Sequence, residues 1–193
     1  MQSYIYNIDA GDVYIDKAEL ALRLKTPRDF KDDTIEKCIV LVKKSIKPAC
    51  AYVKVPCNVT GENVDLGFMT VSSKDLSVNL SGCTEAYVVA VTLGVETDRL
   101  IQRLSLVSAA EGFVADAAAS AMAESLMDIA NTHLRTLNEL RPRFSPGYGD
   151  LDVSVQRSVL EILGADKILG IKLGDNYLMT PRKSITAICG IIN

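Results

Sequence analysis

The feature that most constrains the fold is an alanine-rich stretch from Leu106 to Leu134. Alanine has the highest helix propensity, so the stretch predicts one long helix. Small side chains along a helix also allow another backbone or a ligand to approach it closely. Acidic residues interrupt its apolar character, and two of them, Glu124 and Asp128, share a face because they are four positions apart.

The clearest strand is the continuous β-branched run Ala86–Leu93, which is typical of a strand buried on both faces. Further helices are expected over residues 15–24, 32–46, 72–80, 98–104 and 150–163, and further strands over 51–55, 64–71, 168–173, 177–180 and 184–192. No strict strand–helix–strand rhythm is present. The sequence therefore predicts an α+β fold with a mixed or antiparallel central sheet flanked by helices. No repeat or long linker divides residues 1–193, so we expect one domain.

Composition excludes several classes of function. The net charge of −3, the absence of tryptophan and the lack of a basic stripe argue against nucleic acid as a partner. No apolar run approaches the ~20 residues that span a bilayer, and the N-terminal segment lacks a signal-peptide pattern. The five cysteines form no C-x-x-C pair and are expected to be reduced core thiols, so we expect a cytoplasmic protein. The single histidine, His133, excludes His-pair metal sites and argues against Ser-His-Asp chemistry.

The segment Arg141–Asp150 concentrates two arginines, two prolines, two glycines and a tyrosine in ten positions. Proline restricts the backbone, and glycine allows a ligand to lie against it. A stiff turn with an arginine at one end and a tyrosine at the other predicts a clamp for a small zwitterionic ligand. The alternative is an ordinary loop between two helices, in which Arg143 forms a surface ion pair with Asp150.

Five motifs carry a resemblance to a known family. In chain order they are Leu80–Cys83, Val91–Gly94, Phe113–Ala117, Arg143–Asp150 and Pro181–Ala187. Together they resemble the activation (reactivation) domain of cobalamin-dependent methionine synthase, in its stand-alone bacterial subunit form. The resemblance extends from Leu76 to the C-terminus, whereas residues 1–75 match less clearly. It implies a methionine synthase activation domain-like fold.

The family binds S-adenosylmethionine through the signature R-x-x-P-G-Y, which falls here on Arg143, Pro146, Gly147 and Tyr148. The resemblance implies that Arg143 contacts the ligand, that the backbone of Ser145 faces it and that Glu124 helps to hold it. The ligand-binding residues that it implies are Glu124, Arg143, Ser145, Gly147 and Tyr148. No match is found near Asp9, Asp12 or Asp16 for an aspartate that the family uses near its N-terminus, and Leu20–Phe30 lacks a Tyr-Leu-Gly-Tyr turn of stand-alone relatives.

The residue types suit this ligand. Arg143 can hold a carboxylate in a bidentate pair, Glu124 can accept from an ammonium, and Tyr148 offers a hydroxyl and a π-face to a cation. Alternatives are that Glu124 pairs with a neighbouring segment of the chain and that Tyr148 belongs to the core. Lys183 and Ser184 are candidate partner contacts, although edge-strand lysines are also a common device against aggregation.

The resemblance implies an S-adenosylmethionine-binding activation subunit that supports reductive methylation of cob(II)alamin. The cobalamin is expected on a methionine synthase partner, with an electron donor such as flavodoxin, so the chain is expected to be a methyltransferase subunit that is inactive alone. One alternative is a scaffold of the same fold that docks to a corrinoid protein without binding S-adenosylmethionine. Another is an unrelated enzyme that uses Glu124 and Asp128 as acid and base.

Overall fold

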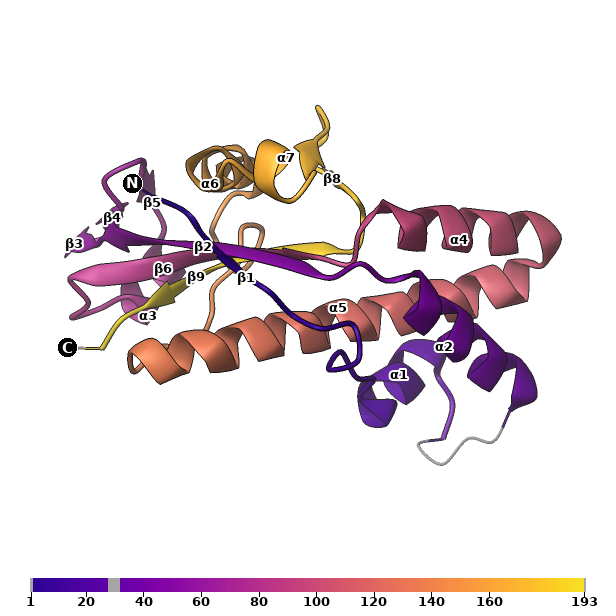
Figure 1. Ribbon diagram of the computed structural model, residues 1–193. Helices are drawn as coiled ribbons and strands as arrows, with labels where there is room; N and C mark the ends of the chain where they lie inside the picture. Colours follow the sequence, from indigo (N-terminus) through magenta and orange to yellow (C-terminus); the bar gives the residue numbers. More distant parts are fainter. Residues whose placement is uncertain (1, 28–31, 193) are drawn as a thin grey trace.

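A four-stranded antiparallel sheet with the strand order β1-β2-β6-β9 lies at the centre of the computed structural model, which describes residues 2–27 and 32–192. Its strands are β1 (Tyr4–Tyr6), β2 (Ala49–Pro56), β6 (Glu85–Thr92) and β9 (Ser184–Gly190). Helices flank the sheet on both faces, which confirms the predicted α+β class (Figure 1). Residues 28–31, which include part of the segment without the family's early turn, lie outside the described residues.

The longest helix lies along one face of the sheet and extends past its end, where the N-terminal helices pack against it (Figure 1). The helices of this layer are α1 (Lys17–Leu24), α2 (Asp33–Ser45), α4 (Val95–Val107) and α5 (Ala109–Leu137). The opposite face is covered by α6 (Gln156–Leu163) and α7 (Ala165–Ile168). The smaller elements are β3 (Asn58–Thr60), β4 (Asn63–Asp65), β5 (Thr70–Ser72), α3 (Lys74–Asn79), the 3₁₀ helix η1 (Val153–Val155), β7 (Lys172–Leu173) and β8 (Met179–Thr180).

The central strand β6 explains why both faces of the sheet are covered. Tyr87, Val89 and Val91 belong to the core cluster under α5, whereas alternate residues such as Val88 pack into the cluster under α6. Side chains of a strand point alternately to its two faces, so a continuous apolar run requires a cover on each. Full burial of one valine contributes about 1.5–3 kcal/mol, and the run therefore supplies much of the stability that both layers share.

The two helices predicted over 98–104 and Leu106–Leu134 are both present, but the division between them lies at Ser108, three residues later than predicted. This residue has an extended backbone, and its hydroxyl accepts from the Glu111 amide at 3.2 Å, so α5 begins at Ala109 and α4 ends at Val107. Ser-x-x-Glu before an apolar run is the sequence signature of a helix start, and it was overlooked. The helix predicted over 98–104 begins earlier, at Val95, and Thr97 is buried within its first turn.

Other boundaries follow local chemistry. Asp32 caps α2, the helix predicted over 32–46, since its carboxylate accepts from two backbone amides of the first turn. Gly164 ends α6 in the left-handed conformation, with φ 62°. The segment 64–71, predicted as one strand, contains instead the end of β4, a turn and the start of β5, because Gly67 adopts a positive φ and reverses the chain.

Candidate functional site

The loop that joins α5 to η1 runs beside β9 as an irregular extra strand. The backbone of Phe144 exchanges two hydrogen bonds with Ile188, at 2.8 and 2.7 Å, and the amide of Arg141 donates to the Gly190 carbonyl at 2.9 Å. The hydroxyl of Ser145 extends this pairing by donating to the Thr186 carbonyl at 2.7 Å. These hydrogen bonds to the edge strand β9 therefore fix the position of residues 141–145.

A carboxylate anchors the far end of the same loop. Asp150 accepts from the amides of Lys74 and Asp75, at 2.8 and 3.3 Å, and from the Ser73 hydroxyl, so it caps α3 from outside that helix. The hydrogen bond from Ser73, followed by those from the backbone, lowers the pKa of Asp150. The predicted alternative of an ion pair between Arg143 and Asp150 is wrong, because this carboxylate is committed to α3.

Arg143 instead binds two acidic residues of α5. Its terminal nitrogens lie 2.8 Å from Glu124 Oε2 and 3.0 Å from Asp128 Oδ1, and the three side chains are 30%, 33% and 54% exposed in the order Arg143, Glu124, Asp128. Residues four apart are neighbours on a helix, so one guanidinium can bridge both carboxylates. The expected pairing of Glu124 with another segment of the chain is present, and the cluster carries a net charge of −1.

A small hollow of about 150 Å³ lies over this cluster. Its lining consists of Glu124, Arg143, Ser145, Tyr148 and Ile185, so α5, the loop and β9 each contribute to it. Ligand pockets usually measure roughly 300–1,000 Å³, and this hollow can therefore hold only one end of a metabolite. An arginine flanked by carboxylates suits the end of a ligand that carries both a carboxylate and a cation.

Two residues of the signature lie differently from the others. Tyr148 lines the hollow with a side chain that is 70% exposed and meets the Phe144 ring edge-on at 6.3 Å, so the alternative that it belongs to the core is wrong. Gly147 does not line the hollow, and its amide donates to the Leu151 carbonyl at 2.8 Å. Its φ of 84° is favourable only for glycine, which makes its role the shape of the turn.

A second ion-pair cluster on α5 involves Lys183, whose side chain is only 11% exposed. Its ammonium lies 2.8 Å from Asp116 Oδ1 and donates to Ser120 Oγ at 2.8 Å. Ser184 is buried and bonds to the Thr92 hydroxyl. Ser184 is therefore buried away from a partner, and the ion pair of Lys183 with Asp116 means that the lysine presents no free charge beside the edge strand β9. A partner contact at Lys183 stays a prediction.

A third feature, which sequence reasoning missed, is a hollow of about 300 Å³ near the N-terminal segment. Its lining consists of Tyr6, Tyr14, Asp128, Ile129, Thr132, His133 and Thr136. The imidazole of His133 stacks on the Tyr6 ring at 3.9 Å with an interplanar angle of 5°. Their 127-residue separation in sequence hides this contact, and only the pairing of β1 with β2 brings Tyr6 near the end of α5.

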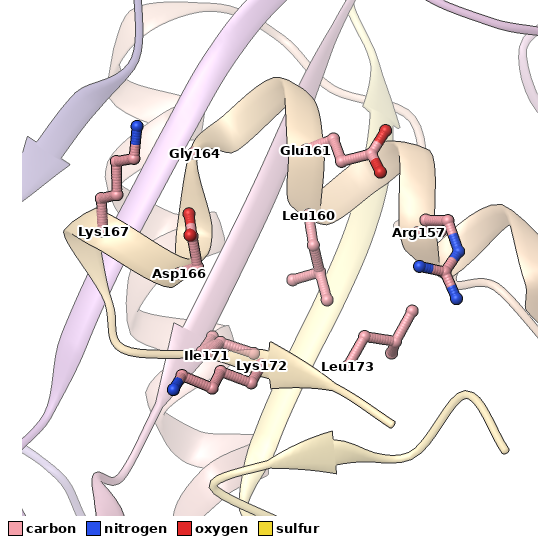
Figure 2. Close-up of a pocket in the computed structure, with 9 residues that line it drawn as sticks. All are labelled: Arg157, Leu160, Glu161, Gly164, Asp166, Lys167, Ile171, Lys172 and Leu173. Atoms are coloured by element: carbon pink, nitrogen blue, oxygen red, sulfur yellow. The ribbon is translucent and has the colours of Figure 1, made fainter. Parts of the chain in front are cut away.

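A further hollow, of about 580 Å³, lies away from these clusters between α6, α7 and β7. Figure 2 shows Leu160 and Leu173 pointing into the space between α6 and β7, while the charged groups of Glu161 and Lys167 point away from it. No charged residue of its lining forms an ion pair with another described residue. It lacks the converging polar groups that define a specific site, so size alone does not make it the candidate.

Two classes of site are absent from the part of the chain that the structure describes. Residues 2–27 and 32–192 contain no group of three or more histidine, cysteine or acidic side chains placed to hold a metal ion. Across the same ranges, no helix combines the length and the apolar character needed to cross a membrane.

Comparisons with known proteins agree with this architecture. No family model matches the sequence, and no curated protein matches it. Among solved structures, the crystal structure of the MetH reactivation domain bound to AdoHcy matches with a TM-score of 0.76, at 15% sequence identity, covering 99% of this chain and 78% of that chain. The chain therefore shares the fold of that reactivation domain.

Proposed function

We propose that the chain binds S-adenosylmethionine at the hollow over Arg143 and supports reductive methylation of a cobalamin that a partner protein carries. The observation that carries the proposal is the convergence of Glu124, Arg143, Ser145 and Tyr148 on one hollow. They come from α5 and from the loop, and they are residues that the sequence resemblance implies. The fold that supports them is also that of a domain crystallised with AdoHcy.

The charges of the site suit the amino-acid end of this ligand. Arg143 uses two of its five N–H donors on Glu124 and Asp128, which leaves others for a ligand carboxylate. Glu124 and Asp128 in turn favour the ligand's ammonium and sulfonium, because the cluster has one more negative than positive charge. A ligand of this size exceeds a hollow of about 150 Å³, so its remaining parts lie along the neighbouring surface.

The chain's contribution to the chemistry is binding and orientation. S-adenosylmethionine supplies the methyl group, and the partner's corrin accepts it. The site holds the methyl donor in a fixed geometry, and this proximity is what raises the rate of methyl transfer. No residue of the site needs to transfer a proton. The assignment of Glu124 and Asp128 as an acid–base pair has little support, because both bind one guanidinium.

A second candidate function is a docking scaffold of the same fold that does not bind S-adenosylmethionine. It is favoured by one observation: both terminal nitrogens of Arg143 already have carboxylate partners within the chain. A ligand must compete with these contacts, whereas a scaffold would retain them as a structural bridge between the loop and α5.

Thermal denaturation and calorimetric titration with S-adenosylmethionine separate the two functions. At a hundredfold excess over the dissociation constant, binding adds about 2.7 kcal/mol, which raises the midpoint by roughly 5–10 °C for a chain of this size. The matched control is Arg141→Lys, a change in the same loop at a guanidinium that donates to the Ser81 carbonyl instead. We expect this variant to bind as the wild type does. A wild-type chain that shows no binding heat and no shift at millimolar ligand, yet captures a cobalamin-carrying partner, refutes the binding function and favours the scaffold.

A further inference from the structure

Four polar residues follow one stripe of α5 at intervals of four positions: Asp116, Ser120, Glu124 and Asp128. Successive members are about 6 Å apart along the helix axis, since the rise is ~1.5 Å per residue. Lys183 balances Asp116, one cation against one anion, at 2.8 Å. Arg143 faces both Glu124 and Asp128, so this half of the stripe carries an uncompensated negative charge.

Asp128 stands between two hollows. Its carboxylate bonds to Arg143, which lines the small hollow. Asp128 itself lines the hollow of about 300 Å³, together with Tyr6, Tyr14 and His133. Arg143 is the one cation among the described residues that line either hollow. Together they reach the size range of ligand sites, which the small one alone does not.

We propose that Asp128 distinguishes the sulfonium of S-adenosylmethionine from the neutral thioether of S-adenosylhomocysteine. This inference rests on the proposed function. A ligand whose amino-acid end is held by Glu124 and Arg143 passes Asp128 one helical turn farther along α5. The Asp128 carboxylate, which shares one guanidinium with Glu124 in a cluster of net charge −1, then faces the position of the sulfur.

The nucleoside of such a ligand enters the hollow of about 300 Å³ beyond Asp128. Tyr14 is 51% exposed, and the stacked rings of Tyr6 and His133 form part of the same wall. Aromatic faces of this kind stack on purine bases. The geometry thus assigns an order along α5, with the amino-acid end at Glu124, the sulfur at Asp128 and the base near His133.

The opposite direction along α5 is less suitable. It leads to a hollow of about 370 Å³ beside Asp116 and Lys183, and neither of these residues bonds to Arg143 as Asp128 does. The charge of Asp116 is already neutralised by a lysine that is 11% exposed. A sulfonium placed there gains no net attraction.

The test compares the dissociation constants of S-adenosylmethionine and S-adenosylhomocysteine by isothermal titration calorimetry. We expect the wild type to prefer the sulfonium by about fivefold, the effect of one partly screened charge at contact distance. In Asp128→Asn the preference falls to about one. The ratio cancels any change in how Arg143 holds the ligand carboxylate, because both ligands share that group.

The matched control is Asp116→Asn, which removes the same charge from the same helix three intervals of the stripe away and leaves the ratio at its wild-type value. Tyr14→Ala weakens both ligands by the same factor and leaves the ratio unchanged. An unaltered ratio in Asp128→Asn overturns the inference while the proposed function stands. A ratio lost in Asp116→Asn places the sulfur at the other hollow and also overturns it. Failure of both ligands to bind the wild type refutes the proposed function itself.

Discussion

Replacement of Arg143 by lysine is the perturbation that separates a ligand clamp from a structural bridge. The guanidinium reaches Glu124 and Asp128 at 2.8 and 3.0 Å, whereas a compact ammonium can contact only one of them well. All three side chains are at least 30% exposed, so each contact contributes only about 0.2–1 kcal/mol. We expect Arg143→Lys to lower the free energy of unfolding by less than about 1 kcal/mol.

Arg143→Ala removes both contacts and leaves two carboxylates facing each other at i and i+4, which adds a repulsion of about 0.2–0.5 kcal/mol. The expected total is a loss of about 1–2 kcal/mol, or a fall of roughly 2–8 °C in the melting temperature. Neither variant is expected to unfold the protein, because the loop stays paired to β9 through its backbone.

The assay is thermal denaturation of the wild type and both variants, with and without S-adenosylmethionine. The reasoning predicts a ligand-induced rise for the wild type and none for either variant, since lysine cannot reproduce bidentate recognition of a carboxylate. A wild-type rise in Arg143→Lys would refute the clamp. A loss of stability far above 2 kcal/mol in Arg143→Ala would show that the cluster is chiefly structural.

Three further predictions concern the loop of the site, the contact between α4 and α5, and the buried cysteines. Gly149→Ala is expected to destabilise the loop, because the φ of 51° at this position disfavours a Cβ, which would also displace the Asp75 carboxylate; a denaturation midpoint equal to that of the wild type would contradict this. Gly112→Ala should cost about 1–3 kcal/mol in chemical denaturation, since its Cβ would approach the Ser105 Cα of α4 to 2.7 Å, and a loss below the error of the measurement would show that the two helices can separate freely. Burial raises the pKa of Cys50 and Cys189 to about 12 and that of Cys57 to about 11, so the folded thiols hold their protons. Their contribution to the free energy of unfolding is therefore complete below the unfolded pKa of about 8.5 and is lost as the pH rises toward 11–12. These thiols should be unreactive toward a disulfide reagent at pH 8 until the protein is denatured, and rapid labelling of the folded chain would contradict their burial.

Much of the fold was predictable because local patterns and tertiary packing agree. The run at Ala86–Leu93 is apolar at every position except Thr92, and the strand β6 that it forms is buried on both faces. The alanines of α5 likewise pack closely against the sheet. The division between α4 and α5 lies at Ser108, three residues beyond the predicted position, because helix propensity continues through this segment and only the Ser108 cap marks the boundary.

The site was predictable in its residues more than in its contacts. The signature identified Arg143 and Tyr148, but nothing in their spacing shows that Asp128 shares the guanidinium or that Asp150 caps α3. These contacts join segments 15 and 76 residues apart, and they depend on the path of the loop beside β9. Long-range polar contacts of this kind leave no periodic pattern in a sequence.

The most direct test of the proposed function is a crystal structure of the chain with S-adenosylmethionine. The account predicts the amino-acid end of the ligand between Glu124 and Arg143, with its sulfur beside Asp128 and its base toward His133. Two results would contradict it. One is ligand density in the hollow of about 580 Å³ between α6 and β7. The other is an Arg143 that keeps its contacts with both carboxylates while the ligand binds elsewhere.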